Sequence, residues 1–174
     1  DNSNIGSPNY TTNAYTANIV YEKDLVNLMK SGRRWFGEKL DFYNRSFNLP
    51  RYTFNDYIPG EDATVRYGLA GRSLVSRIYF NILANNINVA NTSFSAIGKY
   101  DYAFDITTVA TFKPTGPNID LQLAFTPSGT NDLGWLDFMA LNVRCYLKFN
   151  GGQLAFRDPK SVGPDRITTF TMDN

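Results

Sequence analysis

Cys145 is the residue whose chemistry most directly suggests catalysis, because a thiolate is a strong nucleophile. It is the only cysteine in the 174-residue sequence. A cysteine nucleophile needs a base within hydrogen-bonding reach, usually histidine, and the sequence contains no histidine. Cys–His catalysis and a Ser–His–Asp triad are therefore excluded for this chain. We expect no catalytic residue in it, and so no enzymatic activity of its own.

The sequence around the thiol alternates apolar and polar residues, as a half-buried strand does. One face carries the apolar residues Leu141, Val143, Cys145, Leu147 and Phe149. The other face carries Asn142, Arg144, Tyr146 and Lys148. Burial among aliphatic side chains raises a thiol pKa and lowers its reactivity. The pattern therefore predicts that Cys145 is a packing residue.

Metal ligands are scarce. Without histidine and with one thiol, the sequence offers no zinc site and few transition-metal sites. Oxygen ligands remain, and Asn131, Asp132 and Asp137 are weak candidates for calcium. Asp and Asn in such loops more often stabilise turns. We expect no cofactor.

The stretch SGRRWFGEKLDF, residues 31–42, places a basic pair beside two aromatic residues. Arg33, Arg34 and Trp35 could present an aromatic–guanidinium surface to a ligand or to a neighbouring domain. The alternative is that Trp35 is a core residue on a strand entering the fold, and we favour this alternative.

The elements that position these residues are strands, because a period of two dominates the sequence. We expect strands at 40–49, 63–70, 77–84, 87–90, 100–112, 119–125, 135–149, 153–157 and 166–172. Asn85 and Asn86 suit a tight hairpin turn. Residues 22–30 allow either one or two helical turns or an irregular edge segment.

These strands predict an all-β fold: an antiparallel β-sandwich, jelly-roll-like (galactose-binding-like), with at most one short helix. We expect a loose N-terminal segment at 1–15 and a single β-sandwich domain at 16–174. The sequence starts at Asp1, so we expect an excised fragment or a processed product.

Composition excludes two classes of partner. Hydrophobic residues make up 43% and the net charge is +1. Nucleic-acid binders usually carry a strong basic excess, so no nucleic-acid partner is expected. No apolar run approaches the ~18 residues of a membrane-spanning helix, so no span is expected.

Four stretches, taken in order, resemble one known family: residues 22–42, LAGRS (69–73), GWLDFMALN (134–142) and NGGQLAFRDPKSVG (150–163). They are similar to the region preceding the catalytic domain in gingipain-like cysteine peptidases of the type IX secretion signal peptidase/sortase (PorU) family. The resemblance covers about 150 residues, from Tyr21 to Asn174. It implies an exported Bacteroidota protein at the outer membrane, the cell surface or in the periplasm.

The resemblance also implies that the catalytic Cys and His lie downstream of this sequence. Neither maps onto a residue here, and Cys145 matches no catalytic motif. The leading hypothesis is a non-catalytic accessory domain that packs against the downstream peptidase domain of the same chain and contacts secreted cargo or cell-surface polysaccharide. The alternative is a carbohydrate-binding module, which predicts exposed coplanar aromatic rings on a concave face or loop rim.

Overall fold

The computed structural model describes residues 6–30, 32–149 and 151–173, and almost every regular element in them is a strand. The one helical element is the single 3₁₀ turn η1 (Pro159–Ser161). The strands are β1 (Tyr10–Thr12), β2 (Ala14–Glu22), β3 (Lys39–Asp41), β4 (Ser46–Asn48), β5 (Tyr52–Thr53), β6 (Ala63–Arg72), β7 (Ile78–Ala84), β8 (Ile87–Phe94), β9 (Phe104–Phe112), β10 (Asn118–Ile119), β11 (Leu121–Thr126), β12 (Leu133–Tyr146) and β13 (Thr168–Phe170).

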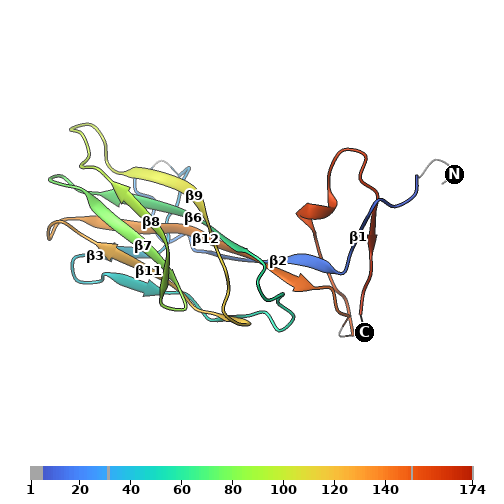
Figure 1. Cartoon of the computed structure of the whole chain (residues 1–174). Coiled ribbons are helices and arrows are strands. Elements are labelled where there is room, and N and C mark those ends of the chain that lie inside the picture. The colour runs from blue at the N-terminus through green and yellow to red at the C-terminus, as the bar shows by residue number, and fades with distance from the viewer. Residues whose placement is uncertain (1–5, 31, 150, 174) are drawn as a thin grey trace.

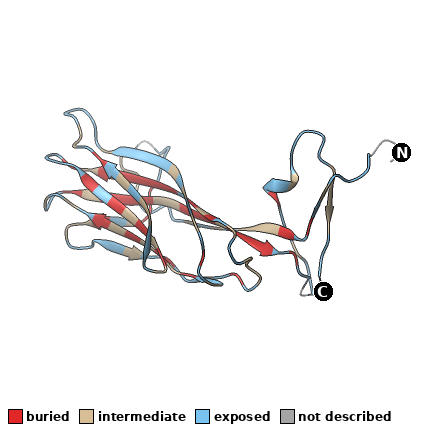
Figure 2. Cartoon of the chain, in the orientation of Figure 1, coloured by how far each residue is buried: buried red, intermediate tan, exposed pale blue. Residues whose placement is uncertain are grey.

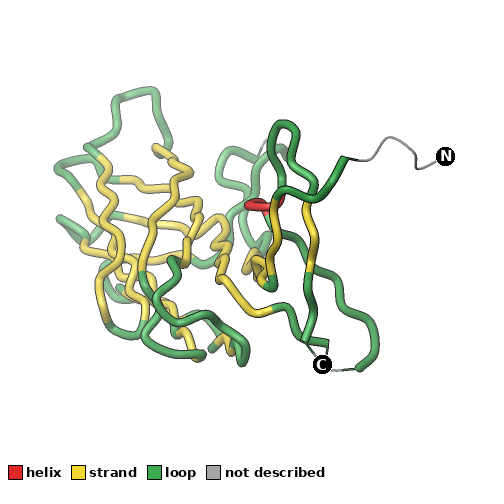
Figure 3. Tube along the Cα trace, turned by 45° about the vertical axis from the view of Figure 1, so that its right-hand side comes forward, coloured by secondary structure: helices red, strands yellow, loops and turns green. Residues whose placement is uncertain are grey.

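Two antiparallel sheets pack face to face, as Figures 1 and 3 show. One has the order β2-β12-β6-β9, with β3 also paired to β12, and the other has the order β4-β11-β7-β8. The first and last long strands of the sandwich, β2 and β12, are neighbours, and the chain crosses repeatedly between the sheets. This is the strand order of a jelly roll. The predicted all-β antiparallel sandwich is confirmed.

The core lies between the sheets, where β6, β7, β11 and β12 turn apolar residues inward, and Figure 2 shows the buried residues along these strands. In β7 the burial alternates along the strand, and Ile78, Phe80 and Ile82 are buried. In β11 the same alternation buries Leu121, Leu123 and Phe125. The rings of Phe80 and Phe125 meet with centroids 4.8 Å apart.

The predicted hairpin joins β7 to β8. Asn85 and Asn86 adopt φ values of 49° and 66°, in the left-handed region that Asn tolerates better than most residues. The Asn85 side chain also accepts a hydrogen bond from the Asp120 amide at 2.8 Å.

Of the two alternatives for residues 22–30, the irregular edge segment is the one that forms: Glu22 ends β2, Val26 bridges to Phe36, and Lys30 has a φ of 52°. Expected strands differ in two further places. The strand expected at 153–157 does not form. The strand expected from residue 100 begins at Phe104, where β9 reaches the last of its partners on β6, Gly71.

β2 and β12 run past the sandwich and carry a small second body, on the right in Figure 1. We call residues 6–13, 148–149 and 151–173 the terminal module. In it β1 and β13 form an isolated parallel pair. Residues 10–12, part of the segment expected to be loose, are therefore a strand, whereas residues 1–5 lie outside the described residues. A domain boundary at residue 15 remains a prediction.

Candidate functional site

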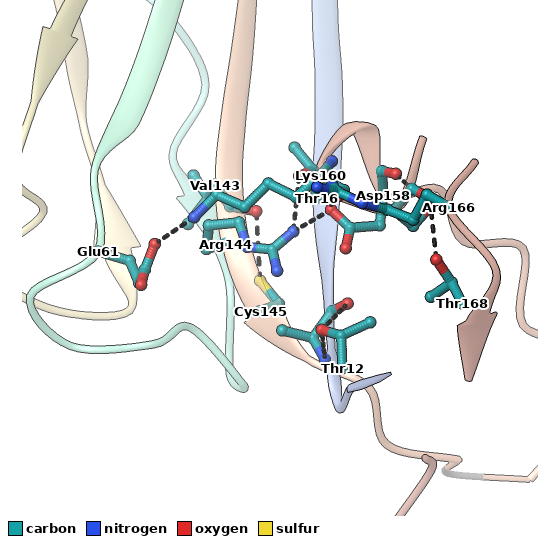
Figure 4. Close-up of polar contacts among 12 residues, drawn as sticks. Thr12, Thr16, Glu61, Val143, Arg144, Cys145, Asp158, Lys160, Arg166 and Thr168 are labelled. Atoms are coloured by element: carbon teal, nitrogen blue, oxygen red, sulfur yellow. Dashed lines mark hydrogen bonds and ion pairs between the residues drawn. The ribbon is translucent and has the colours of Figure 1, made fainter. Parts of the chain in front are cut away.

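Cys145 lies on β12 with its side chain in the core, and only 2% of the residue is exposed. Burial raises the pKa of the thiol to about 11, and the negative charge of Asp56 adds to the shift. The sulfur lies 3.8 Å from the Val143 carbonyl oxygen, as Figure 4 shows. At neutral pH the group is a protonated thiol, which is a poor nucleophile.

Arg34 joins two strands on the outer face of the five-stranded sheet. Its guanidinium forms ion pairs with Asp105 on β9 and with Asp137 on β12, the latter at 2.9 Å. The same group lies over the ring of Phe36, 5.0 Å from the centroid. Its charge is therefore used within the chain, where it fastens the loop between β2 and β3 to the sheet.

A bulge in β12 sets the position of Asp137. The register between β12 and β6 shifts between Leu136 and Met139. Both residues in the shift, Asp137 and Phe138, then lie against Gly68 on β6. A Cβ at Gly68 would lie 2.9 Å from Asp137 Cβ and 2.9 Å from Phe138 Cε1. Glycine is therefore required here by the close approach, and a simple alternating pattern does not reveal the shift.

The other two residues of the basic–aromatic stretch remain at the surface. Arg33 is exposed, and Trp35 is 43% exposed. The interpretation of Trp35 as a core residue is wrong, because its neighbour Phe36 takes the buried place, packed with Ala70 and Trp135. A cavity of about 120 Å³ lies beside Phe36 and Arg34. A ligand or docking role for Arg33, Arg34 and Trp35 remains a prediction.

Two of the weak calcium candidates, Asp132 and Asp137, form hydrogen bonds or ion pairs within the chain. Asp132 is buried, and one carboxylate oxygen accepts hydrogen bonds from the Ser128 amide, the Ser128 hydroxyl and the Gly129 amide at 2.7–2.8 Å. Burial alone would raise the pKa of Asp132, but hydrogen bonds from Ser128, Ser73 and Gly129 outweigh it and lower this pKa. Asn131 is exposed beside it.

Asp137, by contrast, is engaged by Arg34. Within the described ranges, no three His, Cys, Asp or Glu side chains gather as a metal site would require. The Asp132 geometry is that of a turn-stabilising carboxylate.

The terminal module is fastened to the sandwich by polar contacts. Arg144 of β12 forms an ion pair with Asp158, and their side chains are 9% and 0% exposed. Arg144 Nη1 also donates to Thr16 Oγ1 at 3.2 Å (Figure 4). We call this contact between the module and the sandwich the joint. Two more ion pairs cross it, Lys160 with Glu61 at 3.0 Å and Lys148 with Asp56 at 3.1 Å.

The sequence did not reveal the structural role of Asp158, although its position before Pro159 carries a signal. Asp followed by Pro is typical of a helix start, where the side chain caps the first amides. Here the Asp158 carboxylate accepts from the Lys160 amide at 3.1 Å, at the start of η1. The cap predicts the turn, but nothing local predicts that the same carboxylate meets Arg144.

An open polar cleft of about 500 Å³ lies between the joint and the outer face of the five-stranded sheet. Its lining combines hydroxyl, amide and charged groups from the sheet, the β5–β6 loop and η1: Thr16, Glu61, Asp62, Thr64, Thr111, Asn142, Arg144, Pro159 and Lys160. Asn142, one of the lining residues, accepts a hydrogen bond from Asn18 Nδ2 at 2.9 Å and donates one to Thr64 Oγ1 at 3.2 Å.

No family model and no curated protein matches the sequence. Among solved structures, the fold is similar to a crystal structure of dimeric latent PorU from Porphyromonas gingivalis. The two are 16% identical with a TM-score of 0.73, over 90% of this chain and 15% of that one. The match spans only a small part of the PorU chain, and at this identity the likeness shows the fold.

A second similar structure is the CBM36-1 domain of a multidomain xylanase from the hindgut metagenome of Trinervitermes trinervoides. It is 10% identical, covers 80% of this chain and 100% of its own, and has a TM-score of 0.43. In the described part of the chain, no helix has the length and apolar character needed to cross a bilayer.

Proposed function

We propose that this chain is a non-catalytic accessory β-sandwich domain of an exported cysteine peptidase resembling the type IX secretion signal peptidase/sortase family. The observation that carries the proposal is the fold shared with PorU over 90% of the chain. The four sequence stretches that resemble the same family support it independently. The inward thiol of Cys145 and the lack of histidine fit a domain that performs no cysteine catalysis itself.

The domain acts by packing against and positioning the downstream peptidase domain of its parent, which removes C-terminal signals from secreted cargo. The parent belongs to a Gram-negative bacterium of the Bacteroidota and works at the outer membrane, the cell surface or in the periplasm. Contacts with cargo or with cell-surface polysaccharide belong to the same proposal. The near-neutral net charge of +1 gives no reason to propose a nucleic acid as a partner.

The test compares the purified 174-residue chain with the complete product of its gene, using peptides that carry a type IX C-terminal signal. We expect cleavage by the complete product and none by the chain alone. In the complete product, Cys145→Ala should retain cleavage, while replacement of the downstream cysteine should abolish it. Cleavage by the isolated chain, or loss of cleavage in Cys145→Ala without loss of folding, would refute the proposal.

A second candidate function is carbohydrate binding, and the polar cleft favours it. Its hydroxyl and amide groups are those that read sugar hydroxyls. The lining contains no aromatic residue, so stacking on a sugar ring would not contribute there. Calorimetric titration with neutral and anionic oligosaccharides tests this candidate, with Asn142→Ala as the cleft variant and Asn91→Ala on β8 as control. Binding that persists unchanged in Asn142→Ala would place the sugar elsewhere.

A further inference from the structure

The described residues of the terminal module form no hydrophobic core of their own. Among its described residues only Thr12 and Asp158 are buried, and both are polar. Four large apolar side chains in the module are exposed: Phe149, Phe156, Val162 and Met172. The sandwich beside it has a complete core between its sheets, so burial of apolar surface stabilises the sandwich but hardly the module.

The β1–β13 pair is unusual because it is a small parallel pair with little apolar cover. Its strands are parallel over three residue pairs, from Tyr10 with Thr168 to Thr12 with Phe170, and no further described strand joins them. Parallel sheets in proteins are almost always covered on both faces. Two-stranded sheets are marginal without a packing partner. The described residues cover the pair only in part: the ring of Phe156 lies 5.1 Å from that of Phe170, the Arg166 guanidinium lies 4.9 Å from the ring of Tyr10, and only Thr12 of the six paired residues is buried.

We propose that the terminal module is the surface on which the adjoining domain of the parent docks, burying the β1–β13 pair and the exposed apolar side chains around it. This inference rests on the proposed function, which supplies that domain. The first and last residues that the structure describes, Gly6 and Asp173, both belong to the module (Figure 1). A domain joined at the C-terminal end is thus held beside the module at an effective concentration of about millimolar.

The rival surface is the opposite end of the sandwich, where Leu74, Val75 and Tyr100 are exposed in loops. These loops extend from sheets whose core is already closed, so they do not require cover for stability. The two surfaces offer a matched pair of valines. Val162 in the module is 78% exposed, and Val75 at the far end is 87% exposed.

The first experiment places Val162→Asp and Val75→Asp separately in the complete gene product and in the 174-residue chain. Exposed substitutions are normally near neutral, so neither should change the chain alone. In the complete product, Val162→Asp should speed limited proteolysis within residues 148–173 by roughly tenfold, because it places a charge in the docked surface. Val75→Asp should leave that rate unchanged. No effect of Val162→Asp, or the effect at Val75→Asp instead, would overturn the inference.

The second experiment needs no variant. Hydrogen exchange should show the amides of β1 and β13 protected in the complete product and exchanging rapidly in the chain alone, while β6 and β12 are protected in both. Equal protection of β1 and β13 in the dilute chain would mean that the module is self-sufficient. Protection that rises with the concentration of the chain would mean that a second copy covers the module. Either result contradicts the proposal.

These outcomes are independent of the peptidase assay. A complete product that protects β1 and β13 but cleaves no peptide would refute the proposed function and retain the docking surface. A product that cleaves peptides but leaves β1 and β13 unprotected would do the reverse.

Discussion

Arg144 and Asp158 form an ion pair in which both side chains are nearly inaccessible to water, at 9% and 0% exposure. The pair joins the last long strand of the sandwich to a module without a hydrophobic core. Desolvation of two charges is costly, so such a pair contributes little net stability, but removing one partner leaves a buried unpaired charge. We therefore expect the Arg144–Asp158 pair to fix the position of the module relative to the sandwich.

Replacing Asp158 with Ala should detach the module, because Arg144 would otherwise be buried without a counter-charge. The expected cost to the joint is about 3 kcal/mol. In the complete gene product, where we expect the module to be protected, hydrogen exchange in residues 148–173 should become faster while the sandwich stays protected. Asp120→Ala is the control, because Asp120 pairs with exposed Arg51, and exposed pairs contribute less than about 1 kcal/mol. If both variants behave alike, the buried pair does not hold the joint.

Cys145 should resist alkylation in the folded chain. With the pKa of the thiol raised to about 11 by burial, the thiolate fraction at pH 8 is roughly two orders of magnitude below that of an exposed cysteine. Iodoacetamide labelling followed by mass spectrometry should be slow in buffer and rapid in denaturant. Rapid stoichiometric labelling of the native chain would contradict the inward placement of the sulfur.

Stability should also decline at alkaline pH because of this thiol. A folded-state pKa raised above the unfolded value means that the native state holds its proton longer, so stability falls as pH rises from about 9 to about 11. Denaturant titrations across this range should show a smaller decline in Cys145→Ala than in the unmodified chain. An identical decline in both would remove Cys145 as its cause.

Asp132 should make the chain sensitive to acid. Its pKa is lowered in the folded state, so its contribution is complete above the unfolded pKa and is lost as pH falls through the lower folded value. Asp132→Asn should cost about 1–2 kcal/mol at pH 7, and the difference should shrink as pH falls below about 4. Added calcium should not raise the melting temperature, since the carboxylate already accepts three hydrogen bonds in its turn. A calcium-dependent rise in melting temperature that Asp132→Asn abolishes would show that calcium binds at Asp132.

Arg34→Ala should loosen the loop between β2 and β3, because Asp105 and Asp137 would lose their shared counter-charge. The loop then loses the two ion pairs that attach it to the sheet, which should cost about 1 kcal/mol, given that the side chain of Arg34 is partly exposed. The neighbouring Arg33→Ala is the matched control and should be neutral. Proteolysis within residues 23–38 measures the effect, which should weaken at high salt. Equal cleavage of the two variants would mean that Arg34 does not fasten the loop.

The residues that pack the sandwich could be identified from the sequence, because each strand's alternation is local. Val65, Tyr67 and Leu69 are buried as the period of two requires, and Cys145 follows the same rule. The Asn85-Asn86 turn could also be predicted from the sequence, since few residues other than Asn and Gly accept two successive positive φ values. The Trp35 interpretation failed because residues 32–38 lie in an irregular loop, where alternation does not decide which of two adjacent aromatic residues is buried.

Sequence alone therefore determined the all-β sandwich, the inward thiol and the lack of an imidazole to activate it, since these depend on composition and on the geometry of single strands. Only the tertiary structure decided that Arg34 meets Asp105 and Asp137, and that Arg144 meets Asp158. Such meetings depend on strand order, on the bulge opposite Gly68 and on the path of the chain after β12. A shift of one residue moves every later side chain of a strand to the other face, and no local pattern records it.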